Sequence, residues 1–98
     1  MLDKIKTLIE TQKKIEEMKR QLDETDFEIT SFDGLLKIKM SGSQEVRELN
    51  ILSELSEVKK VELEKVIKDT YNRAIKRAQH IAAEKMKNIM GFDFHGLI

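Results

Sequence analysis

The sequence predicts an α+β fold in which a three-stranded antiparallel meander lies between two long helices. Residues 26–51 alternate apolar and polar side chains, which is the pattern of strands with one buried face. The flanking segments 1–25 and 58–90 repeat apolar residues at helical spacing, and the first of them contains neither Gly nor Pro. Residues 91–98 follow as an apolar tail, and 98 residues suffice for a single domain.

The middle strand carries the clearest alternation. Leu36, Ile38 and Met40 alternate with two lysines, and a turn is expected directly afterwards at residues 41–43, Ser-Gly-Ser. Phe27 and Ile29, two residues apart, predict a shorter strand ahead of the middle strand. The connection between these two strands contains Gly34, which can adopt a positive φ angle.

The third strand follows the Ser-Gly-Ser turn with an irregularity. Val46, Leu49 and Ile51 are its apolar residues, but the step from Val46 to Leu49 is odd. Since strand side chains alternate with period two, an odd step predicts a β-bulge or a loop residue between them.

The first helix has a partial apolar stripe. Leu8, Ile15 and Leu22 recur every seven residues, over too few heptads for a stable coiled coil. We therefore expect this helix to pack on a partner over only part of its length.

The second helix separates apolar and basic side chains. An apolar stripe runs from Leu63 to Ile81, with small residues such as Ala74 and Ala78 that permit close packing. Between Lys65 and Met90 there are seven basic and only two acidic residues, more than the helix dipole alone favours. The basic face is predicted to contain Lys65, Arg73, Lys76, Arg77, His80 and Lys87.

Composition excludes several classes of protein. The net charge is zero, but residues 1–57 carry a balance of −4 and residues 58–98 a balance of +4, so charge is segregated along the chain. There is no cysteine, which excludes a disulfide scaffold and thiolate metal sites. No apolar run is long enough to cross a bilayer, and no signal peptide is recognisable. A cytoplasmic protein is expected.

No catalytic or cofactor-binding pattern is present. The two histidines, His80 and His95, lack metal-ligand spacing, and the carboxylates alternate with lysines on helix faces instead of pairing. Glycine-rich phosphate loops are absent. We expect neither enzyme activity, nor a cofactor, metal or small-molecule substrate, nor a membrane partner.

The order and residues of these elements resemble the YbaB/EbfC family of bacterial nucleoid-associated DNA-binding proteins. Three segments carry the resemblance: IKTLIETQKKIEEMKRQL in the first helix, GLLKIKMSGSQEVRELNI in the strands, and LEKVIKDTYNRAIKRAQHIAAEKM in the second helix. The last contains the aromatic-Asn-x-Ala step as Tyr71-Asn72-Arg73-Ala74. Together they cover nearly the whole chain.

The resemblance implies a homodimer that is joined through its sheets, projects its helices as arms, and binds duplex DNA in the nucleoid with little sequence specificity. Basic side chains on the arms would contact phosphates. The candidate DNA-binding residues are Lys13, Lys14, Lys19, Arg20, Lys65, Arg73, Lys76, Arg77 and Lys87. The candidate dimer interface consists of Leu36, Ile38, Met40, Leu49 and Ile51.

Two other functions fit the same pattern. Two helices joined by hairpin strands also describe a prefoldin-type, chaperone-like module, although the short heptads and small alanines argue against a long coiled-coil seam. An adaptor that binds acidic protein partners through the basic helix is the other alternative.

Overall fold

The computed structural model describes residues 2–90 and has the predicted α+β architecture. Helix α1 (Leu2–Glu24) leads into strands β1 (Asp26–Thr30), β2 (Leu36–Ser41) and β3 (Val46–Ile51). A short 3-10 helix, η1 (Leu55–Glu57), precedes the long helix α2 (Lys60–Met90). The predicted apolar tail, residues 91–98, lies outside the described part of the chain.

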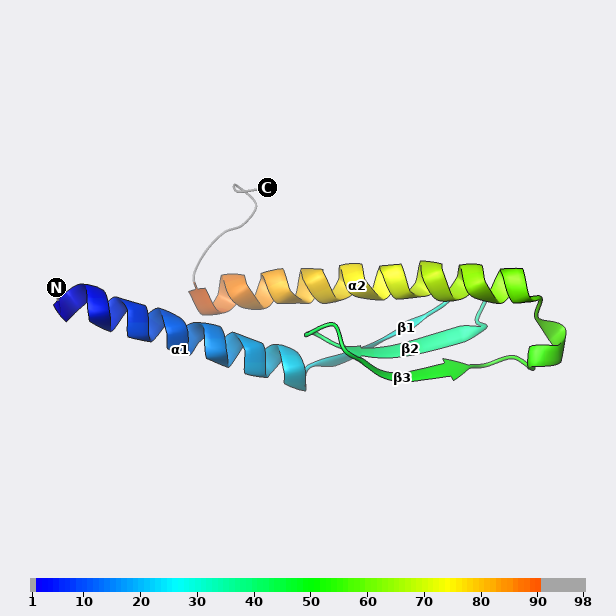
Figure 1. Ribbon diagram of the computed structural model, residues 1–98, viewed down its shortest axis with the longest axis horizontal. Coiled ribbons are helices and arrows are strands. Elements are labelled where there is room, and N and C mark those ends of the chain that lie inside the picture. The colour runs from blue at the N-terminus through cyan, green and yellow to red at the C-terminus, as the bar shows by residue number, and fades with distance from the viewer. Residues whose placement is uncertain (1, 91–98) are drawn as a thin grey trace.

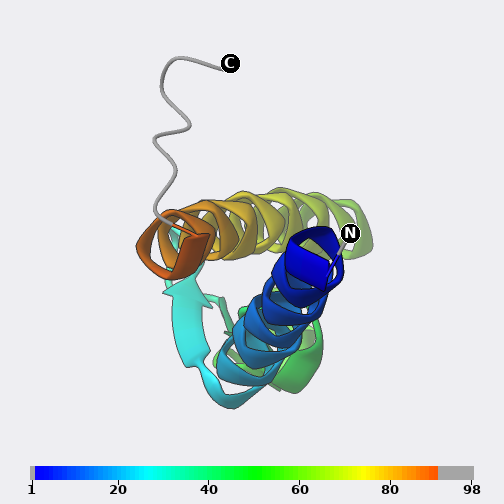
Figure 2. The same cartoon turned by 90° about the vertical axis from the view of Figure 1, so that its left-hand side faces the viewer.

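The molecule is elongated because its helices extend well beyond the sheet. Its radius of gyration is 18.3 Å, whereas a compact chain of this length has about 13 Å. Figure 1 shows α2 lying over the sheet while the N-terminal part of α1 extends past the end of α2. Viewed along the long axis, the two helices cross at an angle (Figure 2). The helices therefore form an arm at one end of the molecule.

The three strands form an antiparallel meander in the order β1-β2-β3, as the sequence predicts. Lys39 pairs with Glu48, but the next pair joins Met40 to Val46, so Arg47 is the extra residue of a bulge. The predicted irregularity between Val46 and Leu49 is thereby confirmed. Gly34 adopts a φ angle of 74° in the β1–β2 turn, for which its lack of a side chain suits it.

The core lies between one face of the sheet and α2. Leu36, Ile38 and Met40 of β2 have no exposed surface, and they pack with the fully buried Ala74 and Ala78 of α2. Because these alanines are small, the helix backbone approaches the sheet closely. Every buried side-chain nitrogen or oxygen among the described residues has a hydrogen-bond partner.

The opposite face of the sheet is polar and needs no covering layer. Glu28, Lys39 and Glu48 occupy paired positions on β1, β2 and β3, so charges of alternating sign lie side by side. Among the strands, helix α2 contacts mainly β2 and β1. The apolar side chains of β3 are thus only partly covered by α2.

Helix α1 joins the core only at its C-terminal end, as its short heptad pattern predicts. Leu22 is buried, whereas Leu8 is 69% exposed. A methyl group on Gly42, in the β2–β3 turn, would lie 3.0 Å from the Leu22 carbonyl oxygen, so this glycine allows the turn to approach α1. The end of α1 is thereby packed against the sheet.

Candidate nucleic-acid interface

Three basic residues of α2 gather on one flank of the helix, which extends from the β1 side to the surface that points away from the sheet. At 100° per residue, Arg73, Lys76 and Arg77 lie within about 100° of one another around the helix axis, and no acidic residue occurs between Thr70 and Ala83. We call these three residues the basic flank. Lys76 and Arg77 are exposed and Arg73 is partly buried. Three permanent positive charges therefore share one surface.

Arg73 is held in place by the end of β1 and the turn that follows it. Its Nη1 donates a hydrogen bond to the Thr30 carbonyl oxygen at 3.3 Å, and its guanidinium carbon lies 3.8 Å from the centre of the Phe32 ring. A guanidinium has five N–H donors. The geometry thus fixes the side chain and leaves donors available to an anion.

Arg77 borders a shallow hollow of about 360 Å³ between α2 and the junction of α1 with β1. His80 and Lys85 also line this hollow, together with Glu84. The remaining lining residues are Thr25, Ile81 and Asn88. The positive surface therefore continues from the basic flank toward the base of the arm.

Lys65 and Lys87 lie on the same side of α2 as the basic flank but about two turns or more from it. Lys65 lines a second hollow of about 290 Å³ together with Glu62 and Asp69, so carboxylates surround it. The five residues predicted on α2 are thus on one side, but only the basic flank forms a dense group.

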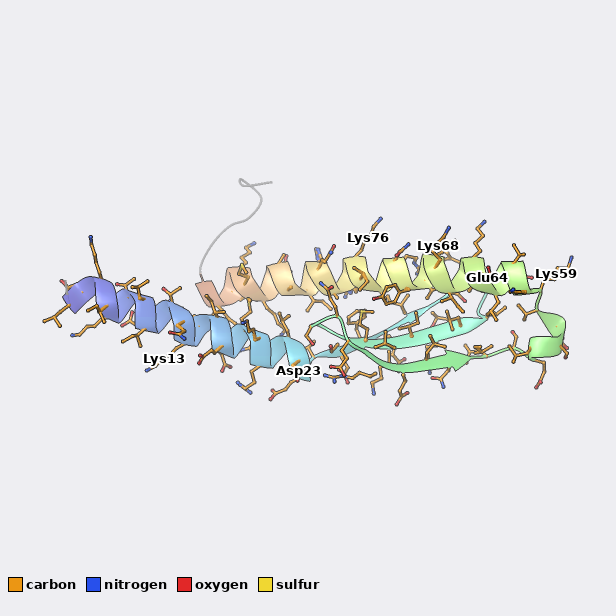
Figure 3. All side chains as sticks on the ribbon, in the orientation of Figure 1. Lys13, Asp23, Lys59, Glu64, Lys68 and Lys76 are labelled. Atoms are coloured by element: carbon orange, nitrogen blue, oxygen red, sulfur yellow. The ribbon has the colours of Figure 1, made fainter. Side chains whose placement is uncertain are left out.

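Lys68 was missed as a candidate on the sequence. Lys68 and Lys76 both point away from the sheet (Figure 3). The signal was available, since Lys68 is three residues from Lys65 and eight from Lys76, and these spacings bring exposed residues to neighbouring parts of one helix surface.

The candidates on α1 do not form one patch. Lys13, Lys14 and Lys19 are exposed, but they differ in direction by 100° or more around the helix, so they point to three sides. Figure 3 shows Lys13 pointing away from α2. Arg20 forms ion pairs with Glu17 and Glu24, and its hydrogen bond to Glu17 is the main cause of its raised pKa. Its charge is largely compensated within α1.

The predicted interface residues divide into two groups. Leu36, Ile38 and Met40 are wholly buried against α2 within one chain, whereas Leu49 is 46% and Ile51 is 38% exposed on β3. Side chains that α2 already covers offer no surface to a second chain within this fold, so the interface stays a prediction that Leu49 and Ile51 fit better than the first three residues. The exposed apolar surface lies on β3 instead.

No group of side chains in residues 2–90 is arranged to hold a metal ion. Among the same residues, no helix is both long enough and apolar enough to span a bilayer.

The chain is a small α+β protein with a projecting helical arm and a group of three cations on one long helix, a charge pattern typical of proteins that bind polyanions. Comparison identifies the family. The YbaB/EbfC DNA-binding family matches residues 1–92, and the chain belongs to it. The resemblance found in the three sequence segments is thus confirmed.

Two relatives illustrate the similarity. A nucleoid-associated protein from Flavobacterium johnsoniae is 33% identical over 93 residues, covering 95% of this chain and 84% of that protein. A nucleoid-associated protein from Clostridium acetobutylicum is 30% identical over 88 residues, covering 89% of this chain and 79% of that protein. Both matches extend over helices and sheet alike.

Proposed function

We propose that this chain is a homodimeric, nucleoid-associated protein that binds duplex DNA with little sequence specificity. The basic flank carries the proposal, because it presents Arg73, Lys76 and Arg77 on one side of a long helix with no carboxylate among them. Membership of a DNA-binding family supports duplex DNA as the polyanion. The two relatives are named nucleoid-associated proteins, which supports a place in the nucleoid.

Low sequence specificity follows from the chemistry of the basic flank. Lysine and arginine side chains neutralise phosphates and release condensed counterions, and phosphates are the same at every base pair. Discrimination between sequences requires side chains that reach base edges in a groove. Long, flexible cations along the side of a helix favour the phosphate contacts.

The dimer is supported by apolar surface that one chain leaves uncovered. Leu49 and Ile51 belong to the edge strand β3, and Tyr71, which is 40% exposed, lies on the opposite side of α2 from Arg73. An edge strand also presents unpaired backbone N–H and C=O groups. Pairing two chains through β3 and this side of α2 would bury all of these groups and leave both basic flanks exposed.

Dimerisation doubles the number of phosphate contacts. Two copies of the basic flank supply six cations, which predict a slope of about −5 for log K against log salt concentration. The affinity should therefore fall by about 10³-fold between 50 and 200 mM salt.

The experiment measures binding of the wild-type chain to several unrelated duplexes across this salt range, with the mass of the free protein determined by sedimentation. We expect a dimer, a steep salt dependence and affinities that differ only a few-fold among sequences. Absence of binding at 50 mM salt would refute the proposal. A chaperone-like module would instead suppress aggregation of an unfolding client in a parallel assay.

A further inference from the structure

Phe32 has 91% of its surface exposed, which exceeds the value for every other exposed large apolar side chain among the described residues. It lies in the β1–β2 turn, outside the core. Apart from its contact with Arg73, this ring has no packing role in the core, so we ask what it could bind.

The turn holds Phe32 rigidly. The Ser31 hydroxyl donates a hydrogen bond to Asp33 Oδ1 at 2.7 Å, and the same oxygen accepts from the Leu35 N–H at 3.1 Å. The Leu36 N–H donates to Ser31 Oγ at 3.0 Å. Ser31 itself is buried. The exposed ring is therefore presented from a preorganised backbone, which lowers the entropic cost of using it in binding.

The charge around Phe32 changes sign from one side to the other. On one side lies the basic flank, with the Arg73 guanidinium 3.8 Å from the ring centre. Toward the N-terminal end of α2 lies the hollow of about 290 Å³, which Phe32 and Arg73 themselves line together with Lys65 and three carboxylates, those of Asp33, Glu62 and Asp69. Carboxylates outnumber cations in the hollow, so a phosphate backbone is attracted more strongly to the side of Lys76 and Arg77.

These surroundings favour DNA over a protein as the ligand of the ring. Protein interfaces place their aromatic residues in desolvated apolar patches, whereas Phe32 is surrounded mainly by charged side chains. DNA-bending proteins place an apolar side chain beside cations, insert it between base pairs and kink the duplex. The proposed dimer surface on β3 lies at the other edge of the sheet and leaves Phe32 accessible.

We propose that Phe32 is a wedge that inserts between two base pairs at the edge of the basic flank and bends the duplex. This inference rests on the proposed DNA binding and adds a mechanism to it. The basic flank attracts phosphates on one side of the inserted ring, while the excess of carboxylates in the hollow makes the other side less favourable to them. The resulting asymmetry favours a kink at the ring.

The first test uses tryptophan fluorescence, because the chain has no Trp. Phe32→Trp supplies a single reporter at the proposed wedge, and Val61→Trp supplies one at another exposed position of 78% exposure. Stacking with bases should quench the emission of the first variant strongly on DNA addition and protect it from acrylamide. The control variant should bind equally well with little change in emission.

The second test measures the bend by energy transfer between the labelled ends of a duplex of about 30 base pairs. Phe32→Ala should lose most of the bend and weaken binding about tenfold, in the range expected for a lost stacking contact. Phe32→Leu should retain a bend, since leucine also acts as a wedge. Because the side chain is exposed, none of these variants should change the unfolding temperature appreciably.

The outcomes separate the two proposals. If the wild type fails to bind DNA, the proposed function fails and the wedge fails with it. If the wild type binds but Phe32→Ala bends DNA equally, or Phe32→Trp emission is unchanged on binding, the wedge alone is refuted. If Phe32→Trp emission changes as two copies of the chain associate but not on DNA addition, the ring is a protein contact and the inference is again overturned.

Discussion

The two sides of α2 differ in chemistry although they belong to one continuous helix. One side carries the basic flank, which begins beside β1, where Arg73 donates a hydrogen bond to the Thr30 carbonyl oxygen. The other side carries the exposed Tyr71, and the exposed Leu49 and Ile51 lie on β3, at the edge of the sheet away from β1. The comparison shows how one helix can keep two proposed interaction surfaces apart, because its stripe of residues buried against the sheet lies between them.

Charge reversal on the basic side should have the largest effect. Lys76→Glu with Arg77→Glu removes four cations from the proposed dimer and adds four anions, so affinity for duplex DNA should fall at least 100-fold at 50 mM salt. Lys4→Glu with Lys6→Glu makes the same change in net charge on exposed positions of α1. This control should bind within about threefold of wild type. Equal losses in both variants would show that net charge matters more than position.

A charge on the apolar side should separate the chains. Leu49→Glu would bury an unpaired carboxylate in the proposed interface, at a cost of roughly 3–5 kcal/mol, so the protein should sediment as a monomer at micromolar concentration. The salt dependence of DNA binding should then fall to about half. Asn50→Glu is the matched control, because residue 50 is exposed and lies on the polar face opposite Lys37. A dimer that survives Leu49→Glu would place the interface elsewhere.

A larger side chain in the stripe of α2 that is buried against the sheet should reduce stability. Ala78 has no exposed surface, so Ala78→Leu should lower the free energy of unfolding by roughly 1–3 kcal/mol through overpacking. Ala83→Leu adds the same atoms at an exposed position and should be nearly neutral. Urea unfolding measures both. A neutral Ala78→Leu would contradict the close approach of α2 to the sheet.

The smallest effect should come from Asp33 in the turn beside the basic flank. The Ser31 hydroxyl, followed by the Leu35 N–H, holds the pKa of Asp33 below its ordinary value. A lowered folded-state pKa gives stability that is present above the ordinary pKa and lost as pH falls through the lowered one. Stability measured from pH 7 to pH 2 should therefore decrease less steeply at the acid end for Asp33→Ala than for wild type. Identical slopes would show that the turn does not use the charged carboxylate.

The fold was largely predictable from the sequence because its patterns are local. Alternation in β2, the odd step after Val46 and the helical spacing in α2 each depend on residues close together in the chain, and all three appear in the structure as predicted. The limited packing of α1 was also foreseen from its short heptad run.

The candidate site was less predictable because it depends on the directions in which side chains point from their helices. Lys13, Lys14 and Lys19 are neighbours in sequence but point to different sides of α1, and the compensation of Arg20 by Glu17 and Glu24 requires side-chain geometry. The burial of Leu36 could not be separated from that of Leu49 by pattern, since both lie on one sheet face. What distinguishes them is that α2 covers β2 and leaves β3 largely bare.

Arg47, the extra residue of the bulge, connects β3 to the base of the arm. Its guanidinium lies 3.1 Å from an Asp23 oxygen, 3.4 Å from Asp26 and 3.2 Å from Glu45. It thus joins the strand that bears the proposed dimer contact to the last turn of α1 and the start of β1. In the proposed dimer, these ion pairs would fix each arm relative to the dimer interface. The protein would then set the distance between the two basic flanks, and hence the spacing of its phosphate contacts along a duplex whose bases it does not read.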